Sequence, residues 1–137
     1  MIYETIRITL PTGRQKGALE ILGRYAERTR FLVGCASCRL YHDEVDPKTI
    51  MLEEVWKAED DLNSHLASAS YQEVLLVMEM ASSEPEVKFI AFSEYSGLER
   101  IQQARMGGSR PELFGDSFPV NPREGTESGR KDLAKKR

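Results

Sequence analysis

The feature that most constrains this chain is a change of hydrophobic period along residues 2–92. Apolar and polar residues first alternate over residues 2–10, which predicts a half-buried strand. Residues 13–29 then place apolar side chains at spacings of three and four, which predicts a helix that packs on a sheet. Thr12 and Gln15 have the spacing of a capping box at the start of that helix.

Two further apolar segments, residues 33–41 and 49–56, are rich in β-branched, aromatic and aliphatic side chains, which are typical of strands. The residues between them include Pro47 and several acids, which favour a turn, so the pair predicts a hairpin. Three acids follow shortly after Trp56. Because acids stabilise the positive end of a helix, a second helix is predicted to begin near residue 59.

A third helix and a last strand complete the pattern. Ser70 and Glu73 have the spacing of another capping box, which predicts a helix start. The buried stripe of this helix is predicted to comprise Tyr71, Val74, Leu75 and Met78. Residues 87–92 are apolar at both parities, so we expect each face of this strand to be covered.

The predicted order is strand, helix, strand, strand, helices, strand, which is the split βαβ order of a ferredoxin-like α+β sandwich. In such a fold the helices cover one face of an antiparallel sheet. Apolar residues occur at both parities of the last two predicted strands, with Ile50 beside Met51 and Phe89 beside Ile90. We therefore expect the uncovered faces of two sheets to pack together in a homodimer.

The chain has 137 residues, of which 40% are apolar and 30% are charged, and this balance is typical of one globular domain. We place that domain at residues 1–97. Residues 98–121 are predicted to form a short helix over residues 98–105 and an apolar extension that docks. Residues 122–137 are predicted to form a basic, mobile tail because they contain almost nothing apolar.

Charge and hydropathy exclude two classes of partner. Residues 122–137 carry six basic and three acidic side chains, so the rest of the chain, with thirteen and nineteen, is acidic. An acidic body with scattered basic residues repels phosphate, which argues against a nucleic-acid binder. The longest apolar run, residues 74–78, is far shorter than the ~20 residues of a membrane-spanning helix. Since the first residues also lack an export signal, we expect a cytoplasmic protein with no membrane partner.

Cys35 and Cys38 are the two cysteines of the chain. On a regular strand, residues three apart point to opposite faces, so these thiols are not expected to form a disulfide or to share a metal. No second cysteine pair is present for a four-cysteine zinc site, and His42 lies beside the predicted turn. We therefore predict no metal site and interpret both cysteines as small buried apolar residues.

Residues 3–101 carry a series of short segments at a characteristic spacing. These segments are Gly34-Cys35 with Arg39-Leu40-Tyr41, Asp46-Pro47, Glu53-Glu54-Val55-Trp56, Leu62, His65-Leu66, Ser68 and Tyr71. In this combination the chain resembles the antibiotic biosynthesis monooxygenase-like (ABM) group of the dimeric α/β barrel superfamily. The resemblance implies a ferredoxin-like protomer that dimerises through its sheet and holds a pocket between sheet and helices. It also implies oxygenation without metal or flavin in some members, and isomerase or haem-degrading activity in others.

Trp56 and His65 are the candidate residues for such chemistry. A strand-end indole can form the wall of a pocket for a flat aromatic substrate, and an imidazole that titrates near neutrality can remove a proton. Deprotonation of a quinol-like or polycyclic aromatic ring gives an anion that reacts with O2 directly, so no cofactor is required. We predict a cofactor-independent monooxygenase with His65 as the catalytic base and Trp56 as a substrate-binding residue. Both side chains also fit a structural role in the core.

Three further side chains are candidate substrate-binding residues. Glu54 and Leu52 share the strand face of Trp56, and Tyr71 offers a hydroxyl group. Glu54 also fits an ion pair at a surface or interface, and Tyr71 also fits the core. Quinol-oxidising relatives hold a substrate oxygen with an asparagine shortly before the tryptophan, whereas this chain has Ile50 and Leu52 there. The alternatives are therefore a non-catalytic dimeric ligand-binding or stress-response module, or an isomerase of a small metabolite.

Overall fold

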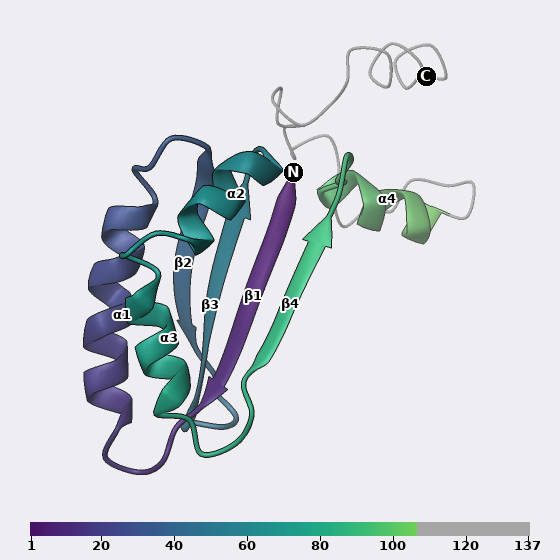
Figure 1. The fold of residues 1–137 in the computed structure, drawn as a ribbon. Coiled ribbons are helices and arrows are strands. Elements are labelled where there is room, and N and C mark those ends of the chain that lie inside the picture. The colour runs from purple at the N-terminus through teal and green to yellow at the C-terminus, as the bar shows by residue number, and fades with distance from the viewer. Residues whose placement is uncertain (107–137) are drawn as a thin grey trace. The chain divides into compact units, whose positions relative to one another are not determined.

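The computed structural model describes residues 1–106, which fall into a unit of residues 1–93 and the first part of a second unit. The first unit contains four strands and three helices (Figure 1). In chain order its elements are β1 (Ile2–Thr9), α1 (Gln15–Thr29), β2 (Cys35–His42), β3 (Thr49–Trp56), α2 (Glu59–Leu66), α3 (Gln72–Glu79) and β4 (Glu86–Ala91).

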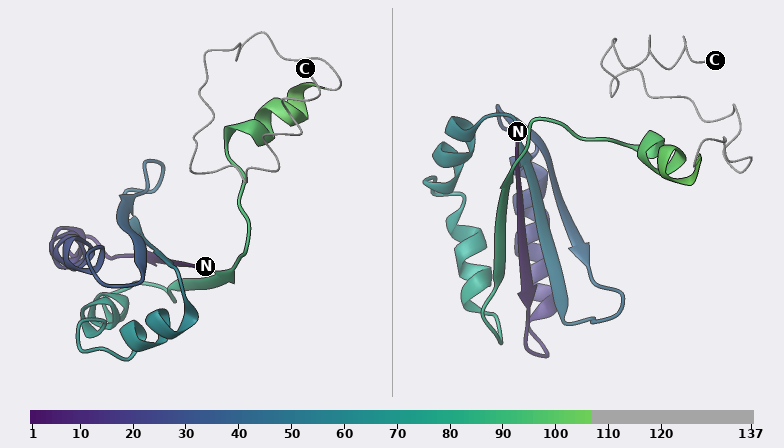
Figure 2. Two further views of the ribbon diagram at one scale, coloured as in Figure 1. Left: turned by 90° about the horizontal axis from the view of Figure 1, so that it is seen from above. Right: turned by 90° about the vertical axis from the view of Figure 1, so that its right-hand side faces the viewer.

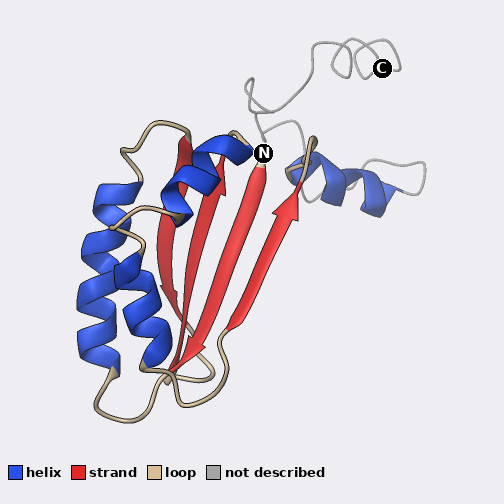
Figure 3. Cartoon of the chain, viewed as in Figure 1, coloured by secondary structure: helices blue, strands red, loops and turns tan. Residues whose placement is uncertain are grey.

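The four strands form one antiparallel sheet in the order β2-β3-β1-β4. Helices α1, α2 and α3 gather on one face of this sheet, as the cartoon in Figure 3 and the rotated views in Figure 2 show. The predicted α+β, ferredoxin-like fold is therefore confirmed. The element bounds agree with the predicted ones to within about two residues.

The register of the strands decides which side chains enter the core. Ile6 of β1 pairs with Leu52 of β3, and Ile8 pairs with Ile50, and all four side chains are buried beneath the helices. Because side chains on a strand alternate between faces, Ile2, Glu4 and their partners on β3 face the helices as well. The register therefore carries two acidic partners, Glu4 and Glu54, into the core.

Both predicted capping boxes are wrong. Gly13 has a positive φ of 91° and ends a turn in which the Arg14 amide donates to the Pro11 carbonyl, so α1 begins at Gln15. The Thr12 side chain forms no capping hydrogen bond with the first turn of α1. The predicted cap of α3 is also missing. A series of tight turns precedes this helix, so it begins only at Gln72 and has no side-chain cap.

The side chains of α3 also differ from the predicted stripe. Tyr71, Val74 and Val77 are buried, whereas Leu75 is exposed. Glu73 does not cap the helix but forms an ion pair with Arg28 of α1. The buried stripe is therefore turned by part of a helical turn from the predicted one.

The expectation that Cys35 and Cys38 point to opposite faces is wrong. A register shift between Cys35 and Ser37 interrupts β2, so that Cys35 pairs with Trp56 and Cys38 pairs with Glu54. Trp56 and Glu54 lie two residues apart on one face of β3, and a bulge of this kind places both cysteines on that face too. Both thiols are free; Cys38 is buried and Cys35 is half-buried.

Strand β4 lies at the edge of the sheet, and every one of its residues is exposed in the described part of the chain. The covered faces predicted for residues 87–92 are therefore not found within residues 1–106. In the second unit, α4 (Leu98–Met106) confirms the short helix predicted over residues 98–105. The structure describes no residue beyond 106. The predicted docking extension, which ends at residue 121, and the predicted tail over residues 122–137 therefore lie outside the described residues.

Candidate functional site

Six polar or aromatic side chains meet beneath the helices and form what we call the buried cluster. They come from β1, α1, β3, α2 and the turn before α3, and none is more than 6% exposed. The members are Glu4, Tyr25, Glu54, Trp56, His65 and Tyr71. Ionisable groups are rarely buried unless they are paired, so a cluster of this kind in a small core points to a function or to a specific structural need.

Glu54 is the centre of the cluster and is completely buried. The Tyr25 hydroxyl donates to its Oε2 at 2.8 Å, and the Trp56 indole Nε1 donates to its Oε1 at 3.0 Å. Nε2 of His65 lies 3.4 Å from the same Oε1. Both oxygens of this carboxyl group therefore have partners, although no solvent reaches them.

His65 is held from three sides. Its Nε2 lies 2.5 Å from the Tyr25 hydroxyl. Its ring stacks at a tilt over Trp56, with centroids 4.7 Å apart, and meets the edge of Tyr71 at 5.7 Å. These contacts fix the orientation of the imidazole, which is a condition for directed proton transfer.

Glu4 forms the second acidic part of the cluster. It is the Cα partner of Glu54 across β1 and β3, and its Oε1 accepts a hydrogen bond of 2.6 Å from the Tyr71 hydroxyl. Its Oε2 is buried and has no hydrogen-bond partner among the described residues. An unpaired buried carboxyl oxygen is costly when it is charged, so the neutral acid is favoured here.

The electrostatics of the cluster favour neutral groups. Burial, together with the nearby Glu4 carboxyl, raises the pKa of Glu54 to about 7, against the opposing hydrogen bonds from Tyr25 and Trp56. Burial also raises the pKa of Glu4. Burial lowers the pKa of His65, so its imidazole is neutral at neutral pH. The cluster therefore holds a neutral histidine beside a carboxyl group that titrates near neutrality.

Unlike the Glu54 carboxyl group, the nearby thiols and phenols do not titrate near neutral pH. Burial raises the pKa of Tyr25 and of Tyr71 further above their ordinary value, so both hydroxyls stay protonated. Burial likewise raises the pKa of Cys35 to about 11 and that of Cys38 further still. Because the thiolate is the reactive form, the two cysteines are poor nucleophiles.

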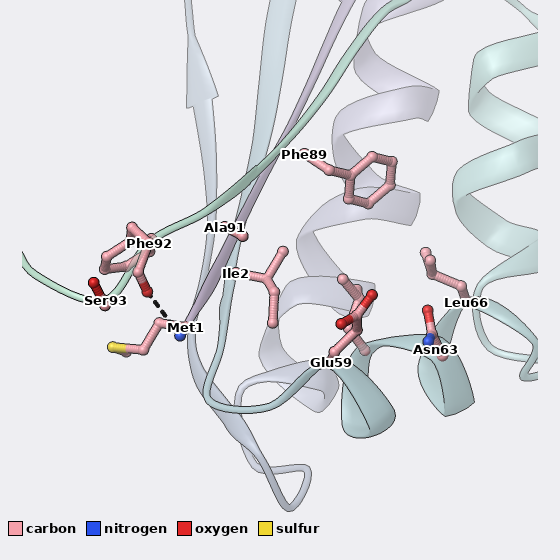
Figure 4. A pocket seen from close by; sticks show the side chains of 10 residues that line it. Met1, Ile2, Glu59, Asn63, Leu66, Phe89, Ala91, Phe92 and Ser93 are labelled. Atoms are coloured by element: carbon pink, nitrogen blue, oxygen red, sulfur yellow. Dashed lines mark hydrogen bonds between the residues drawn. The ribbon is translucent and has the colours of Figure 1, made fainter.

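An open cleft of about 690 Å³ lies beside the cluster, between α2 and the ends of β1 and β4 (Figure 4). Its walls are mainly apolar, and Asn63 and Glu59 of α2 add two polar groups. Figure 4 shows the Phe89 ring directed from β4 toward the α2 side of the cleft. The lining residues are Met1, Ile2, Glu59, Leu62, Asn63, Leu66, Phe89, Ala91, Phe92 and Ser93.

The cleft adjoins the cluster without including it. Leu62 and Leu66, which line the cleft, lie three residues before and one residue after His65 on α2. Phe89, on the other wall, is the Cα partner of Glu4. The cleft therefore borders α2 and β1, the elements that carry His65 and Glu4.

Of the five site residues predicted from the sequence, four meet in the cluster. His65, Trp56, Glu54 and Tyr71 are all members of it. Leu52 lies on the same strand face but packs in the apolar core. None of the five lines the cleft.

The five predicted site residues do not include two members of the cluster, Glu4 and Tyr25. Glu4 lies two positions before Ile6 on the first strand and therefore faces the core. The alternation of apolar and polar residues thus predicts its burial. Tyr25 lies on the buried face of α1. Nothing in its position indicated that its hydroxyl group would reach β3.

Two kinds of feature are absent from the described residues. Within residues 1–106, no group of three or more His, Cys, Asp or Glu side chains is arranged to hold a metal ion. Among the same residues, no helix combines the length and the apolar character that crossing a membrane would need.

The sequence over residues 1–75, more than half of the chain, matches the family described as antibiotic biosynthesis monooxygenase. The matched region contains all six members of the buried cluster. No curated protein matches the chain by sequence.

Several solved structures share the fold. A Deinococcus radiodurans protein provisionally named an antibiotic biosynthesis monooxygenase is 16% identical, with a TM-score of 0.65 over 72% of this chain and 98% of that one. A Mycobacterium tuberculosis protein is 21% identical, with a TM-score of 0.63 over 70% of this chain and 98% of its own. A Bacteroides thetaiotaomicron protein of unknown function, described as a possible oxidoreductase, is 18% identical, with a TM-score of 0.61 over 66% and 96%.

The likeness covers between 66% and 72% of this chain and nearly all of the length of these three proteins. At such low identities the structural likeness establishes the fold and not the reaction. The sequence match is independent of it and covers every strand of the sheet except β4. The family match points to a monooxygenase-type function. The chain belongs to the antibiotic biosynthesis monooxygenase family.

Proposed function

We propose that this protein is a monooxygenase that deprotonates a quinol-like or polycyclic aromatic substrate so that the resulting anion reacts directly with O2. The observation that carries this proposal is the contact of His65 with Tyr25 and Glu54. An imidazole that is neutral at pH 7 can accept a proton, and the Glu54 carboxyl group that is linked to it by hydrogen bonds favours this uptake. The family match supports the same class of reaction.

The cleft beside α2 supplies a place for the substrate. Its volume of about 690 Å³ is in the range of small-molecule pockets, and its apolar walls suit a flat ring. Phe89 can pack against such a ring, while Asn63 can form a hydrogen bond with a ring oxygen. Trp56 supports the site from behind by fixing His65. The proposal requires that the substrate reach His65, which lies between two cleft-lining residues of α2, Leu62 and Leu66.

The chemistry follows from the protonation states. Removal of a hydroxyl proton makes the ring electron-rich, and the mainly apolar walls of the cleft limit the water around the anion. One oxygen atom of O2 is then built into the ring and the other leaves as water, with all electrons supplied by the substrate. This proposal assigns no resident cofactor, and it gives His65 the role of catalytic base.

The test is oxygen uptake by the purified protein, freed of metal and flavin, with a panel of reduced quinols and hydroxynaphthalenes. His65→Ala removes the base, and His42→Ala is the matched control because His42 lies exposed at the hairpin turn. We expect turnover in the wild type and in His42→Ala, and loss of at least a hundredfold in His65→Ala. Equal turnover in all three proteins, or none above the uncatalysed rate, contradicts the proposal.

A second candidate function is a ligand-binding module without catalysis. The observation that favours it is that no member of the buried cluster lines the cleft, so a ligand can occupy the cleft without touching His65. Stable binding of an aromatic compound that is returned unchanged in the presence of O2 distinguishes this candidate from the oxygenase. An isomerase would instead return a product of the same mass.

We also propose that the protein acts as a homodimer in the cytoplasm. The sheet face turned away from the helices carries several apolar side chains among its polar ones, including Met51, Val55 and the exposed Ile90. A second copy that packs on this face would bury them. Two free cysteines fit a reducing compartment.

A further inference from the structure

Three side chains of the buried cluster form an unbroken path of hydrogen bonds. The path runs from Nε2 of His65 to the Tyr25 hydroxyl, at 2.5 Å, and from that hydroxyl to Oε2 of Glu54, at 2.8 Å. The three residues come from α2, α1 and β3, so the path exists only in the folded protein. The second oxygen of Glu54 is occupied by the Trp56 indole, which leaves Oε2 as the end of the path.

The number of protons on this path fixes their positions. A tyrosine hydroxyl has a single proton to donate, and an ionised carboxylate can only accept. When Glu54 is ionised, Tyr25 donates to it, so the contact with His65 requires a proton on Nε2. The neutral imidazole then carries no proton on Nδ1, which is its free acceptor.

The opposite state follows when Glu54 is protonated. The carboxyl proton on Oε2 is donated to the Tyr25 oxygen, and Tyr25 donates to Nε2 of His65. The neutral imidazole must then carry its proton on Nδ1. The two protonation states of Glu54 therefore require opposite tautomers of His65.

We propose that Tyr25 relays a proton between His65 and Glu54, so that a proton taken up at Nδ1 of His65 is stored on Oε2 of Glu54. Tyr25 is a positioning residue in this scheme, because it acts through His65. The use of the relay in turnover rests on the proposed function, whereas the relay itself is a property of the free protein.

Each transfer balances. A hydroxyl proton of the substrate forms a bond with Nδ1 of His65, and the Nε2–H bond breaks as its proton moves to the Tyr25 oxygen. The Tyr25 O–H bond breaks in turn, and its proton forms a bond with Oε2 of Glu54. Two neutral side chains remain neutral, and the negative charge of the carboxylate is exchanged for that of the substrate anion. No imidazolium forms in the buried site.

The surroundings of Glu54 are suited to this storage. Burial and Glu4 bring the pKa of Glu54 to about 7, close to the value that makes a base effective at neutral pH. Burial lowers the pKa of His65, which disfavours an imidazolium. The titratable groups that face Glu54 from the elements packed around it are Glu4, Tyr25, Cys35, Cys38, His65 and Tyr71.

The relay is tested by nuclear magnetic resonance on the full chain without ligand. Histidine labelled with ¹⁵N reports for each ring nitrogen whether it carries a proton, and the chain contains two histidines, His65 and His42. The spectra are recorded between about pH 5 and about pH 9, on both sides of the Glu54 titration. Carbon labelling of glutamate follows the Glu54 carboxyl group in the same samples.

We expect His65 to stay neutral and to move from the Nδ1–H tautomer at low pH to the Nε2–H tautomer at high pH. The midpoint of that change should coincide with the titration of Glu54. Glu54→Gln should hold His65 in one tautomer throughout, and Tyr25→Phe should separate the tautomer of His65 from the titration of Glu54. A wild-type His65 that keeps one tautomer across the Glu54 titration overturns the relay, as does a coupled change that persists in Tyr25→Phe.

The outcome is independent of the proposed function. If Tyr25→Phe does not fold, the wild type and Glu54→Gln decide the question on their own. A coupled tautomer change without oxygen uptake on any substrate keeps the relay and contradicts the monooxygenase. Oxygen uptake by a protein whose His65 never changes tautomer supports the monooxygenase and contradicts the relay.

Discussion

Glu4 and Glu54 face each other across β1 and β3, and neither carboxyl group is more than 1% exposed. Two carboxylates at neighbouring positions of a core repel each other, and each loses the solvation that would stabilise its charge. The pair is therefore a store of free energy that depends on pH. Ionisation of Glu54, at the centre of the buried cluster, therefore lowers the free energy of unfolding.

Glu54→Gln should remove that dependence on pH. The folded state binds a proton on Glu54 up to a pKa of about 7, whereas an unfolded glutamate releases it near its ordinary pKa of 4.5. Between these values the folded state holds more protons, so the contribution of Glu54 to stability falls as the pH rises, by about 3 kcal/mol at most. The stability of Glu54→Gln relative to the wild type should therefore increase over this window, as measured by urea unfolding.

The comparison between the two proteins also separates Glu54 from His65. Because the pKa of His65 is lowered in the folded state, its contribution falls in the opposite direction, as the pH drops below the ordinary value for histidine. His65 is present in both proteins, so this part largely cancels. Glu53→Gln, on the other face of the same strand, controls for the loss of one formal charge. A relative stability that stays constant from low to neutral pH contradicts the buried acidic pair.

Trp56→Phe should shift the titration of Glu54. The substitution keeps an aromatic ring but removes the indole donor to Oε1, so the ionised carboxylate loses one partner. We expect the pKa of Glu54 to rise above its wild-type value and the free energy of unfolding to fall by about 1–3 kcal/mol. Carbon NMR of the carboxyl group and urea unfolding measure the two effects. An unchanged Glu54 titration would show that the indole does not support this carboxyl group.

Phe89→Ala should weaken the binding of aromatic ligands in the cleft. The ring lies half exposed on the cleft wall, and its loss removes the largest aromatic surface offered by β4. We expect the dissociation constant of a hydroxynaphthalene to increase about tenfold, which corresponds to about 1.4 kcal/mol. Val87→Ala is the matched control, since Val87 faces the same side of β4 but does not line the cleft. Equal effects in calorimetry would place the ligand elsewhere.

Ile90→Glu should dissociate the proposed homodimer. Ile90 is 50% exposed on the sheet face turned away from the helices, where a second copy would bury the new charge without a partner. Leu75→Glu changes an equally exposed residue on α3 and is the control. Light scattering should report a dimer for the wild type and for Leu75→Glu, and a monomer for Ile90→Glu. A monomeric wild type would contradict the proposed homodimer.

The sequence was sufficient for the order of the elements because hydrophobic period is a property of neighbouring residues. The alternation around Ile6 and the helical spacing around Leu22 each reflect one buried face. The capping boxes failed because a cap depends on where the preceding turn ends, and Gly13 places that turn later than the spacing suggested. The bulge beside Cys35 left no signal in composition, so the face of both cysteines could not be predicted.

The site was predictable in part for the same reason. His65, Trp56 and Glu54 could be grouped because they lie close together in the sequence and share one strand face or one helix face. Tyr25 and Glu4 reach the cluster from distant elements, and only the strand register and helix packing bring them there. The position of the cleft depends on which side chains of α2 and β4 leave space between them, which periodicity does not describe.

The most direct test of the central claim is the ionisation of a bound substrate before oxygen is admitted. A hydroxynaphthalene is bound under nitrogen at a pH about two units below its own pKa, and its absorption spectrum distinguishes the neutral compound from the anion. Calorimetry establishes that the cleft is occupied in the wild type, in His65→Ala and in the control His42→Ala. We expect the anion in the wild type and in His42→Ala, and the neutral compound in His65→Ala. A bound compound that stays neutral in the wild type would contradict proton abstraction by the buried cluster.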